Sequence, residues 1–117
     1  MNGDNNSPDA GAEFVSFREF LACATIHPLA NHGRTGEVFF CGRSICFVDT
    51  LGTPGLRQAH RGAVNNALYC NEDEVLPNGL RRPLPSKDAL EDYPEMETRF
   101  PRAYARVMNP QQSLLSL

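Results

Sequence analysis

The sequence predicts an α+β fold built from one β-hairpin and several helices. Alternating apolar residues flank a turn glycine between residues 37 and 49, which indicates the hairpin. Residues 54–69 carry apolar side chains at helical spacing, and shorter helical patterns lie before and after them. A chain of 117 residues is about the size of one domain. We therefore expect one small α+β domain over 13–108, with flexible tails at 1–12 and 109–117.

The first predicted helix begins after Ser16. Ser16 and Glu19 have the spacing of a capping box, in which the serine hydroxyl accepts a hydrogen bond from the backbone N–H three residues later. Four apolar residues follow at helical spacing: Phe17, Phe20, Leu21 and Ala24. We expect this helix to continue to about Ile26 and to end before Pro28, because proline has no backbone N–H to donate.

The hairpin is expected to pair residues 37–41 with residues 44–49, with Gly42 and Arg43 as a two-residue turn. One face of the pair is then wholly apolar: Val38, Phe40, Ile45 and Phe47. The other face carries Phe39, Cys41, Cys46 and Val48. Because an isolated hairpin is only marginally stable in water, both faces need cover. A short third strand, the N-terminal helix or another chain could provide it for the second face.

The strongest helical pattern is the long packing helix at 54–69. Thr53 and Pro54 have the residue types of an N-cap and a first helical position. His60 lies on the apolar stripe of this helix, where we expect a hydrogen-bonded core or interface histidine rather than a general base.

Irregular helices are expected at 86–108, after a polar internal loop over 71–85. Ser86 has the residue type and position of an N-cap for the first of them. Pro94 and Pro101 interrupt the helical pattern that follows, because proline removes a helical hydrogen bond.

Composition excludes several classes of partner. The formal net charge is −3, from 14 acidic and 11 basic residues, so the chain lacks the basic surface that binds nucleic acid or anionic membranes. No apolar run approaches the ~20 residues of a membrane span, and the first residues lack the pattern of a secretion signal. We therefore expect a protein of the cytoplasm or another reducing compartment, with four free cysteines.

Two alternative functions rest on the cysteines and histidines. Cys23 and His27 would share one face of the first predicted helix, and Cys41 and Cys46 would share one face of the hairpin. Thiolate and imidazole ligands suit tetrahedral zinc, so a zinc-stabilised binding module is one alternative, and we expect no other cofactor. A small thiol-dependent enzyme that uses Cys41 or Cys46 as its nucleophile is the other.

The favoured function is a small non-catalytic interaction or structural protein. Three arginines repeat at helical spacing along the last predicted helix: Arg99, Arg102 and Arg106. Because guanidinium groups bind carboxylates through paired hydrogen bonds, this stripe indicates a docking face for an acidic protein surface, extended by Arg81 and Arg82. Phe39 adds an apolar contact on the hairpin. We expect the chain to dock onto a larger protein, or to form a homo-oligomer, through these two surfaces.

Overall fold

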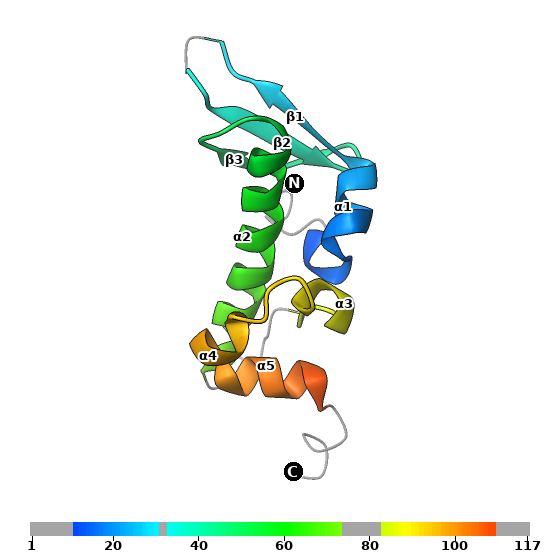
Figure 1. The fold of residues 1–117 in the computed structure, drawn as a ribbon, viewed down its shortest axis with the longest axis vertical. Coiled ribbons are helices and arrows are strands. Elements are labelled where there is room, and N and C mark those ends of the chain that lie inside the picture. Colours follow the sequence, from blue (N-terminus) through cyan, green and yellow to red (C-terminus); the bar gives the residue numbers. More distant parts are fainter. Residues whose placement is uncertain (1–10, 31–32, 74–82, 110–117) are drawn as a thin grey trace, which may run out of the picture.

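The computed structural model describes residues 11–30, 33–73 and 83–109. They form an α+β fold, as the sequence predicts, with a three-stranded sheet at one end of a long helix and shorter helices at the other (Figure 1). In chain order the elements are η2 (Ala12–Phe14), α1 (Phe17–Cys23), β1 (Ala24–Pro28), β2 (Gly36–Phe40), β3 (Arg43–Val48), α2 (Gly52–Glu72), α3 (Lys87–Leu90), α4 (Met96–Arg99) and α5 (Pro101–Met108). Arg81, Arg82 and most of both predicted tails lie outside the described residues.

Helix α1 begins as predicted but ends earlier. The Ser16 hydroxyl accepts a hydrogen bond from the Glu19 backbone N–H at 3.2 Å, which confirms the cap. The prediction that the helix reaches Ile26 is wrong, because β1 begins at Ala24 and pairs with β2. Thr25 and Ile26 are β-branched and fit a pleated strand, and pairing with β2 supplies the backbone hydrogen bonds that another helical turn would have made. The third strand is therefore β1.

The hairpin turn lies one residue earlier than predicted. Phe40 pairs with Arg43, so the two turn residues are Cys41 and Gly42, with φ of 53° and 80°. Two successive positive φ angles are the mark of a type I′ turn, whose twist matches that of the flanking strands. Glycine adopts this conformation without a steric penalty, whereas Cys41 is the only described non-glycine residue with a positive φ.

A β-bulge shifts the pairing of β2 with β3 by one residue beyond this turn. Phe39 pairs with Ser44 but Val38 pairs with Cys46, which leaves Ile45 as the extra residue in β3. Ile45 is buried as predicted, but after the bulge the last residues of β3 exchange sides. Val48 is buried and Phe47 is 60% exposed, the reverse of the predicted arrangement. One inserted residue changes the face of every later side chain, because strand side chains alternate.

Helix α2 connects two hydrophobic clusters. It runs from Gly52 to Glu72, longer at both ends than the predicted 54–69, and Thr53 lies inside it rather than at its N-cap. Its first half packs on the sheet and α1, with Ala59 and Ala63 in that cluster. Its second half packs on α3, α4 and α5, with Val64 and Leu68 in the other cluster. The helix is therefore the shared support of both parts, as Figure 1 shows.

His60 lies where the two clusters meet, and it is completely buried. Its Nε2 atom is 2.8 Å from the Val15 carbonyl oxygen, and its Nδ1 atom is 2.6 Å from the Tyr93 hydroxyl. A carbonyl only accepts, so Nε2 carries the proton and the neutral ring accepts the Tyr93 O–H at Nδ1. This confirms the prediction of a hydrogen-bonded core histidine. One imidazole thereby joins the segment before α1 to the segment after α3.

Two further contacts tie α1 to the segment that follows α3. The Arg57 guanidinium lies 3.6 Å from the centre of the Phe17 ring and donates a hydrogen bond to the Tyr93 hydroxyl at 3.2 Å. The Asp92 carboxylate accepts a hydrogen bond from the Phe17 backbone N–H at 2.8 Å, at the first turn of α1. The charge of Asp92 there also suits the positive end of the helix dipole. Arg57 and Asp92 thus add charged contacts between the two parts of the fold that meet at His60.

Acidification should destabilise the protein through His60. Burial lowers the pKa of His60 below its usual value, against opposing effects that include the Val15 carbonyl and Asp92. The unfolded chain therefore binds a proton at a higher pH than the folded chain does. The free energy of unfolding should fall as the pH drops below about 6.5, and this fall should continue until the folded-state pKa is passed. Urea unfolding between about pH 7.5 and pH 5.5 measures it.

Matched variants separate His60 from the other titrating groups in this experiment. His60→Gln should remove most of the slope of stability against pH, and His27→Gln, a substitution at an exposed histidine, serves as the control that should keep the slope. Equal slopes in the wild type and in His60→Gln would contradict the assignment.

Candidate functional site

The sheet has an outer face that no described element buries. Two cross-strand rows form it, and we call these six residues the outer face: Thr25, Phe39 and Ser44 in one row, and His27, Glu37 and Phe47 in the other. Each of them is exposed or half-buried. The inner face carries Val38, Phe40, Ile45 and Val48, all buried. Of the predicted second face, Phe39 thus lies on this outer face, whereas Val48 is buried and Cys46 is half-buried.

The polar groups of the outer face mostly pair with one another. The Ser44 hydroxyl donates to the Glu37 carboxylate at 2.6 Å, and Thr25 Oγ1 lies 3.1 Å from His27 Nε2. The His27 ring meets the Phe39 ring edge to face, with centroids 5.3 Å apart. A shallow hollow of about 570 Å³ lies over this area and extends to Cys23 and Gly42. Because these polar groups are paired with one another, a molecule bound to the outer face would make its apolar contacts with the rings of Phe39 and Phe47.

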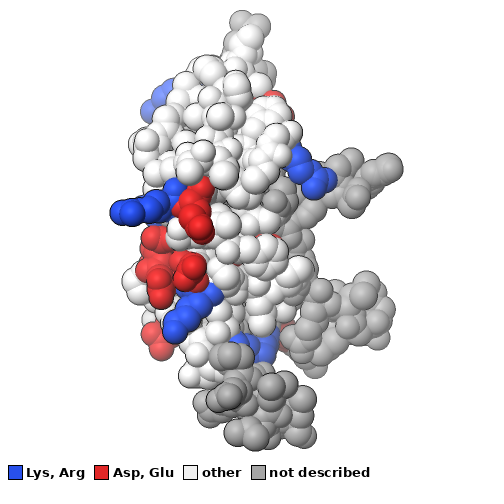
Figure 2. All heavy atoms as spheres, turned by 90° about the vertical axis from the view of Figure 1, so that its right-hand side faces the viewer, with Lys and Arg blue, Asp and Glu red and all other residues white. Residues whose placement is uncertain are grey.

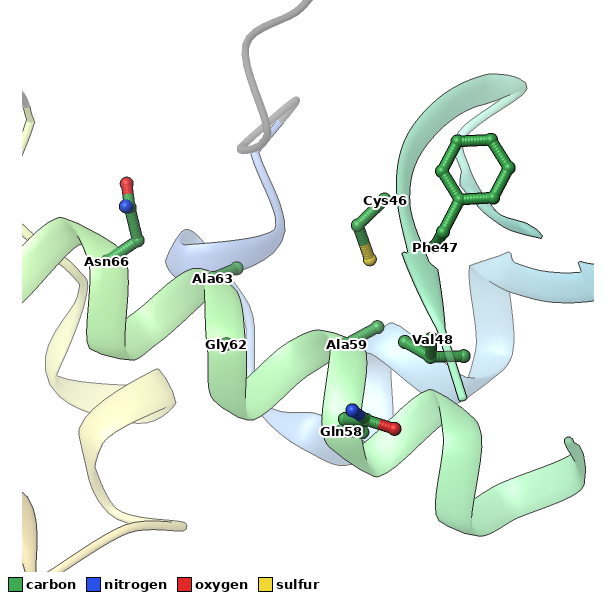
Figure 3. A pocket seen from close by; sticks show the side chains of 8 residues that line it. All are labelled: Cys46, Phe47, Val48, Gln58, Ala59, Gly62, Ala63 and Asn66. Carbon is green, nitrogen blue, oxygen red and sulfur yellow. The ribbon is translucent and has the colours of Figure 1, made fainter. Parts of the chain in front are cut away.

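A second hollow, which we call the edge groove, lies between β3 and α2 (Figure 3). Its volume is about 330 Å³, and its lining is Cys46, Phe47, Val48, Gln58, Ala59, Gly62, Ala63 and Asn66. The side chain of Cys46 points toward α2, whereas the Phe47 ring points away from it (Figure 3). A Cβ atom added at Gly62 would meet no atom within 4 Å, so the helix side of the groove is open.

Strand β3 is an edge of the sheet. The strand order is β1-β2-β3, so within the described ranges β3 pairs with β2 on one side and with no strand on the other. Edge strands present backbone N–H and C=O groups that another extended chain can pair with. The edge groove lies on one side of this strand and the exposed Phe47 ring on the other.

The four predicted zinc ligands do not come together. Cys23 ends α1, His27 lies in β1 and Cys41 lies in the turn, whereas Cys46 points inward toward α2. The expectation that Cys23 and His27 share a helix face is wrong, because the helix ends at Cys23. Within residues 11–30, 33–73 and 83–109, no group of three or more His, Cys, Asp or Glu side chains could hold a metal ion.

Neither predicted nucleophile has the surroundings of an activated thiol. Burial raises the pKa of the Cys46 thiol, which makes its reactive thiolate scarcer at neutral pH. Cys41 is an exposed turn residue, and no described side chain makes a hydrogen bond with its thiol. The geometry therefore gives the thiol-enzyme hypothesis no support.

Two arginines of the predicted stripe cap the end of α2. The Arg102 guanidinium donates to the Glu72 carbonyl oxygen at 3.1 Å and to the Asp73 carboxylate at 3.3 Å, and Arg106 donates to the Asn71 carbonyl oxygen. Helices leave their last carbonyl groups without internal partners, and these guanidinium groups supply donors. Arg99 instead lies over the Phe100 ring, 5.2 Å from its centre.

Glu72, at the end of α2, in turn caps the start of α5. Its carboxylate accepts hydrogen bonds from the backbone N–H groups of Arg102 and Ala103, at 3.2 and 2.9 Å. Each helix end therefore caps the other, and the Glu72 carboxylate also lies 3.6 Å from Arg102 Nε. The sequence does not reveal this role of Glu72, because its partners lie about thirty residues away and no local motif marks them.

Charge is mixed on the side of the molecule seen in Figure 2. Acidic and basic side chains gather there about half-way along the molecule, and the end that carries the sheet is mostly uncharged. Among the described helices, none combines the length and the apolar character that crossing a membrane requires. Comparisons of the chain with family models, with curated proteins and with solved structures found no match.

The reciprocal cap should contribute measurably to stability. Glu72→Ala removes the acceptor for two helix N–H groups and a partner of Arg102, so the free energy of unfolding should fall by about 1–2 kcal/mol. Arg99→Ala removes an exposed side chain that has no part in the cap and should change it by less than about 0.5 kcal/mol. Chemical denaturation of both variants measures the difference. Equal losses in the two variants would contradict the capping role.

Proposed function

We propose that this protein is a small non-catalytic binding protein that takes up an extended segment of a partner protein along the free edge of β3. The observation that carries the proposal is a juxtaposition. An edge strand, a groove whose helix side includes Ala59, Gly62 and Ala63, and the 60% exposed Phe47 ring lie side by side. An unpaired strand edge can pair with another extended chain, and the exposed Phe47 ring beside it offers such a chain an apolar contact.

The edge of β3 suits strand addition. An added strand gains affinity from backbone hydrogen bonds, and its side chains alternate between the two faces of the sheet. On the inner side, alternate side chains of the partner would enter the edge groove over Ala59, Gly62 and Ala63. On the outer side, the intervening side chains would contact Phe47, with Phe39 further along the outer face.

An apolar segment fits this surface better than the acidic one expected from the sequence. The stripe that suggested an acidic partner is partly occupied, since Arg102 and Arg106 bind the end of α2. Near the proposed edge the groove lining is uncharged, and only Gln58 and Asn66 offer polar side chains from α2. Arg43, exposed at the first position of β3, adds one contact for a carboxylate at that end.

A second copy of the chain is a less suitable occupant. Pairing β3 with its own copy would bring two strands together that both carry the bulge at Ile45, whereas an extended partner segment meets that irregularity only once. Sedimentation of the purified protein distinguishes the two cases, because a homodimer that β3 holds together would dissociate in Phe47→Asp.

Peptide selection tests strand addition directly. Short random peptides displayed on phage are selected on the full chain, and the affinity of the recovered peptides is measured by calorimetry. We expect an apolar, alternating consensus and slower amide exchange in β3 on binding. Phe47→Asp and Gly62→Leu should each weaken binding by about tenfold or more, the first by removing the exposed ring and the second by filling the groove.

A matched control is available on the same helix. Tyr69 is 67% exposed but lies in the second half of α2, away from the edge groove, so Tyr69→Asp should leave the affinity unchanged. Gly62→Leu should not unfold the protein, since a Cβ at this position meets open space and leucine favours helix over glycine. Peptides that bind equally to Phe47→Asp, or that protect a region other than β3, would refute the proposal.

A further inference from the structure

Glu37 is the only acidic residue of the outer face, and that face includes no lysine or arginine. Within the described ranges Glu37 forms no ion pair, and its carboxylate accepts one hydrogen bond, from the Ser44 hydroxyl at 2.6 Å. A hydroxyl is neutral and a carboxylate has about four acceptor sites, so this bond leaves the negative charge unbalanced. Glu37 also lines the shallow hollow over the outer face. The outer face therefore presents a single negative charge to whatever covers it.

Ser44 holds this carboxylate toward the free edge of the sheet. Glu37 belongs to the middle strand, β2, whereas the hydroxyl that it binds belongs to β3. A chain paired along the edge of β3 would lie one strand spacing, about 4.7–4.9 Å, from β3. Long side chains span such a distance, because even diagonal neighbours about 7–8 Å apart are within their reach. A long side chain on the added strand can therefore reach the carboxylate.

Phe47 adds a second attraction for a cation on the same side. It lies opposite Glu37 in the register of β2 with β3, and its ring is 60% exposed and points away from α2 (Figure 3). The face of an aromatic ring attracts ammonium and guanidinium groups. Arg43 forms no ion pair with Glu37, and it pairs with Phe40, whose side chain is buried on the inner side of the sheet. A carboxylate and an aromatic ring thus flank the outer side of the proposed edge.

We propose that the partner segment carries a lysine or arginine among its outer side chains, and that Glu37 binds this residue between Ser44 and Phe47. The inference rests on the proposed function and adds the chemistry of one partner side chain. The segment is then apolar toward the edge groove and basic toward the outer face. The Glu37 carboxylate accepts hydrogen bonds from the cation while it keeps the one from Ser44. Because the pair is exposed, it selects among partners more than it adds affinity.

Peptide selection on matched variants tests the inference. Random peptides displayed on phage are selected in parallel on the full-length wild type, Glu37→Gln and Glu97→Gln. Both substitutions remove one negative charge, and Glu97 is exposed on α4, at the end of the molecule opposite the sheet (Figure 1). We expect a lysine or arginine at one outer position in peptides from the wild type and from Glu97→Gln. Peptides from Glu37→Gln should keep the apolar alternation and lose that basic residue.

Calorimetry on one selected peptide measures the pair itself. Replacing the basic residue of the peptide by norleucine removes its charge and keeps an unbranched stem. This replacement should weaken binding to the wild type by about threefold at low salt, as for an exposed charge pair. It should leave the affinity for Glu37→Gln unchanged. The difference should also shrink in about 1 M salt, because salt screens exposed charges.

Three results would overturn the inference and leave the binding function intact. The first is a set of peptides that slow amide exchange in β3 but carry no basic outer residue. The second is a norleucine replacement that weakens binding to Glu37→Gln as much as binding to the wild type. The third is loss of the basic residue in selections on Glu97→Gln, since that would show a response to net charge alone. If no selected peptide slows exchange in β3, the binding function and this inference fall together.

Discussion

One hydrogen-bonded imidazole holds the two parts of this molecule together. Helix α2 extends beyond the sheet, so a single helix packs on two hydrophobic clusters, one at the sheet and one at the C-terminal helices. His60 lies at their boundary, and both of its ring nitrogens need partners because an unpaired polar atom in a core costs about 1–3 kcal/mol. The Val15 carbonyl and the Tyr93 hydroxyl are those partners, one from each part. Together with the Phe17–Asp92 and Ser86–Phe14 hydrogen bonds, these two bonds of His60 fix the relative placement of the two parts.

The candidate binding surface follows from the same placement. His60 lies on the buried side of α2 and faces Val15 and Tyr93. In this orientation of the helix, Gly62 and Ala63 border the edge groove beside β3. A helix that used larger residues there would fill the groove and cover the strand edge. The bulge at Ile45 has a second effect, because it turns Val48 inward and leaves Phe47 outside. The edge groove and the Phe47 ring thus lie along the same strand because α2 and the bulge determine how β3 packs on the inner side of the sheet.

Charged residues serve this fold mainly as connectors between elements. Glu72 and Arg102 join the end of α2 to the start of α5, and Asp92 joins the segment after α3 to the start of α1. These contacts occupy charged groups that, from the sequence alone, would be expected to be solvated or free to bind a partner. The predicted single helix with an arginine stripe is divided at Phe100, so Arg99 ends α4 whereas Arg102 and Arg106 lie on α5. The docking role of these arginines stays a prediction.

Local signals in the sequence were enough for the elements whose ends are capped within a few residues. Ser16, Ser86 and the apolar stripe of α2 act through neighbours in the chain, so their helices were predictable. The tertiary structure alone decided that Ala24–Pro28 is a strand, that Ile45 is a bulge and that Phe47 faces outward. Each of these depends on hydrogen bonds or packing with residues of a different element. Backbone N–H and C=O groups form hydrogen bonds with whichever strand the fold places beside them. The direction in which each side chain points then follows from that pairing.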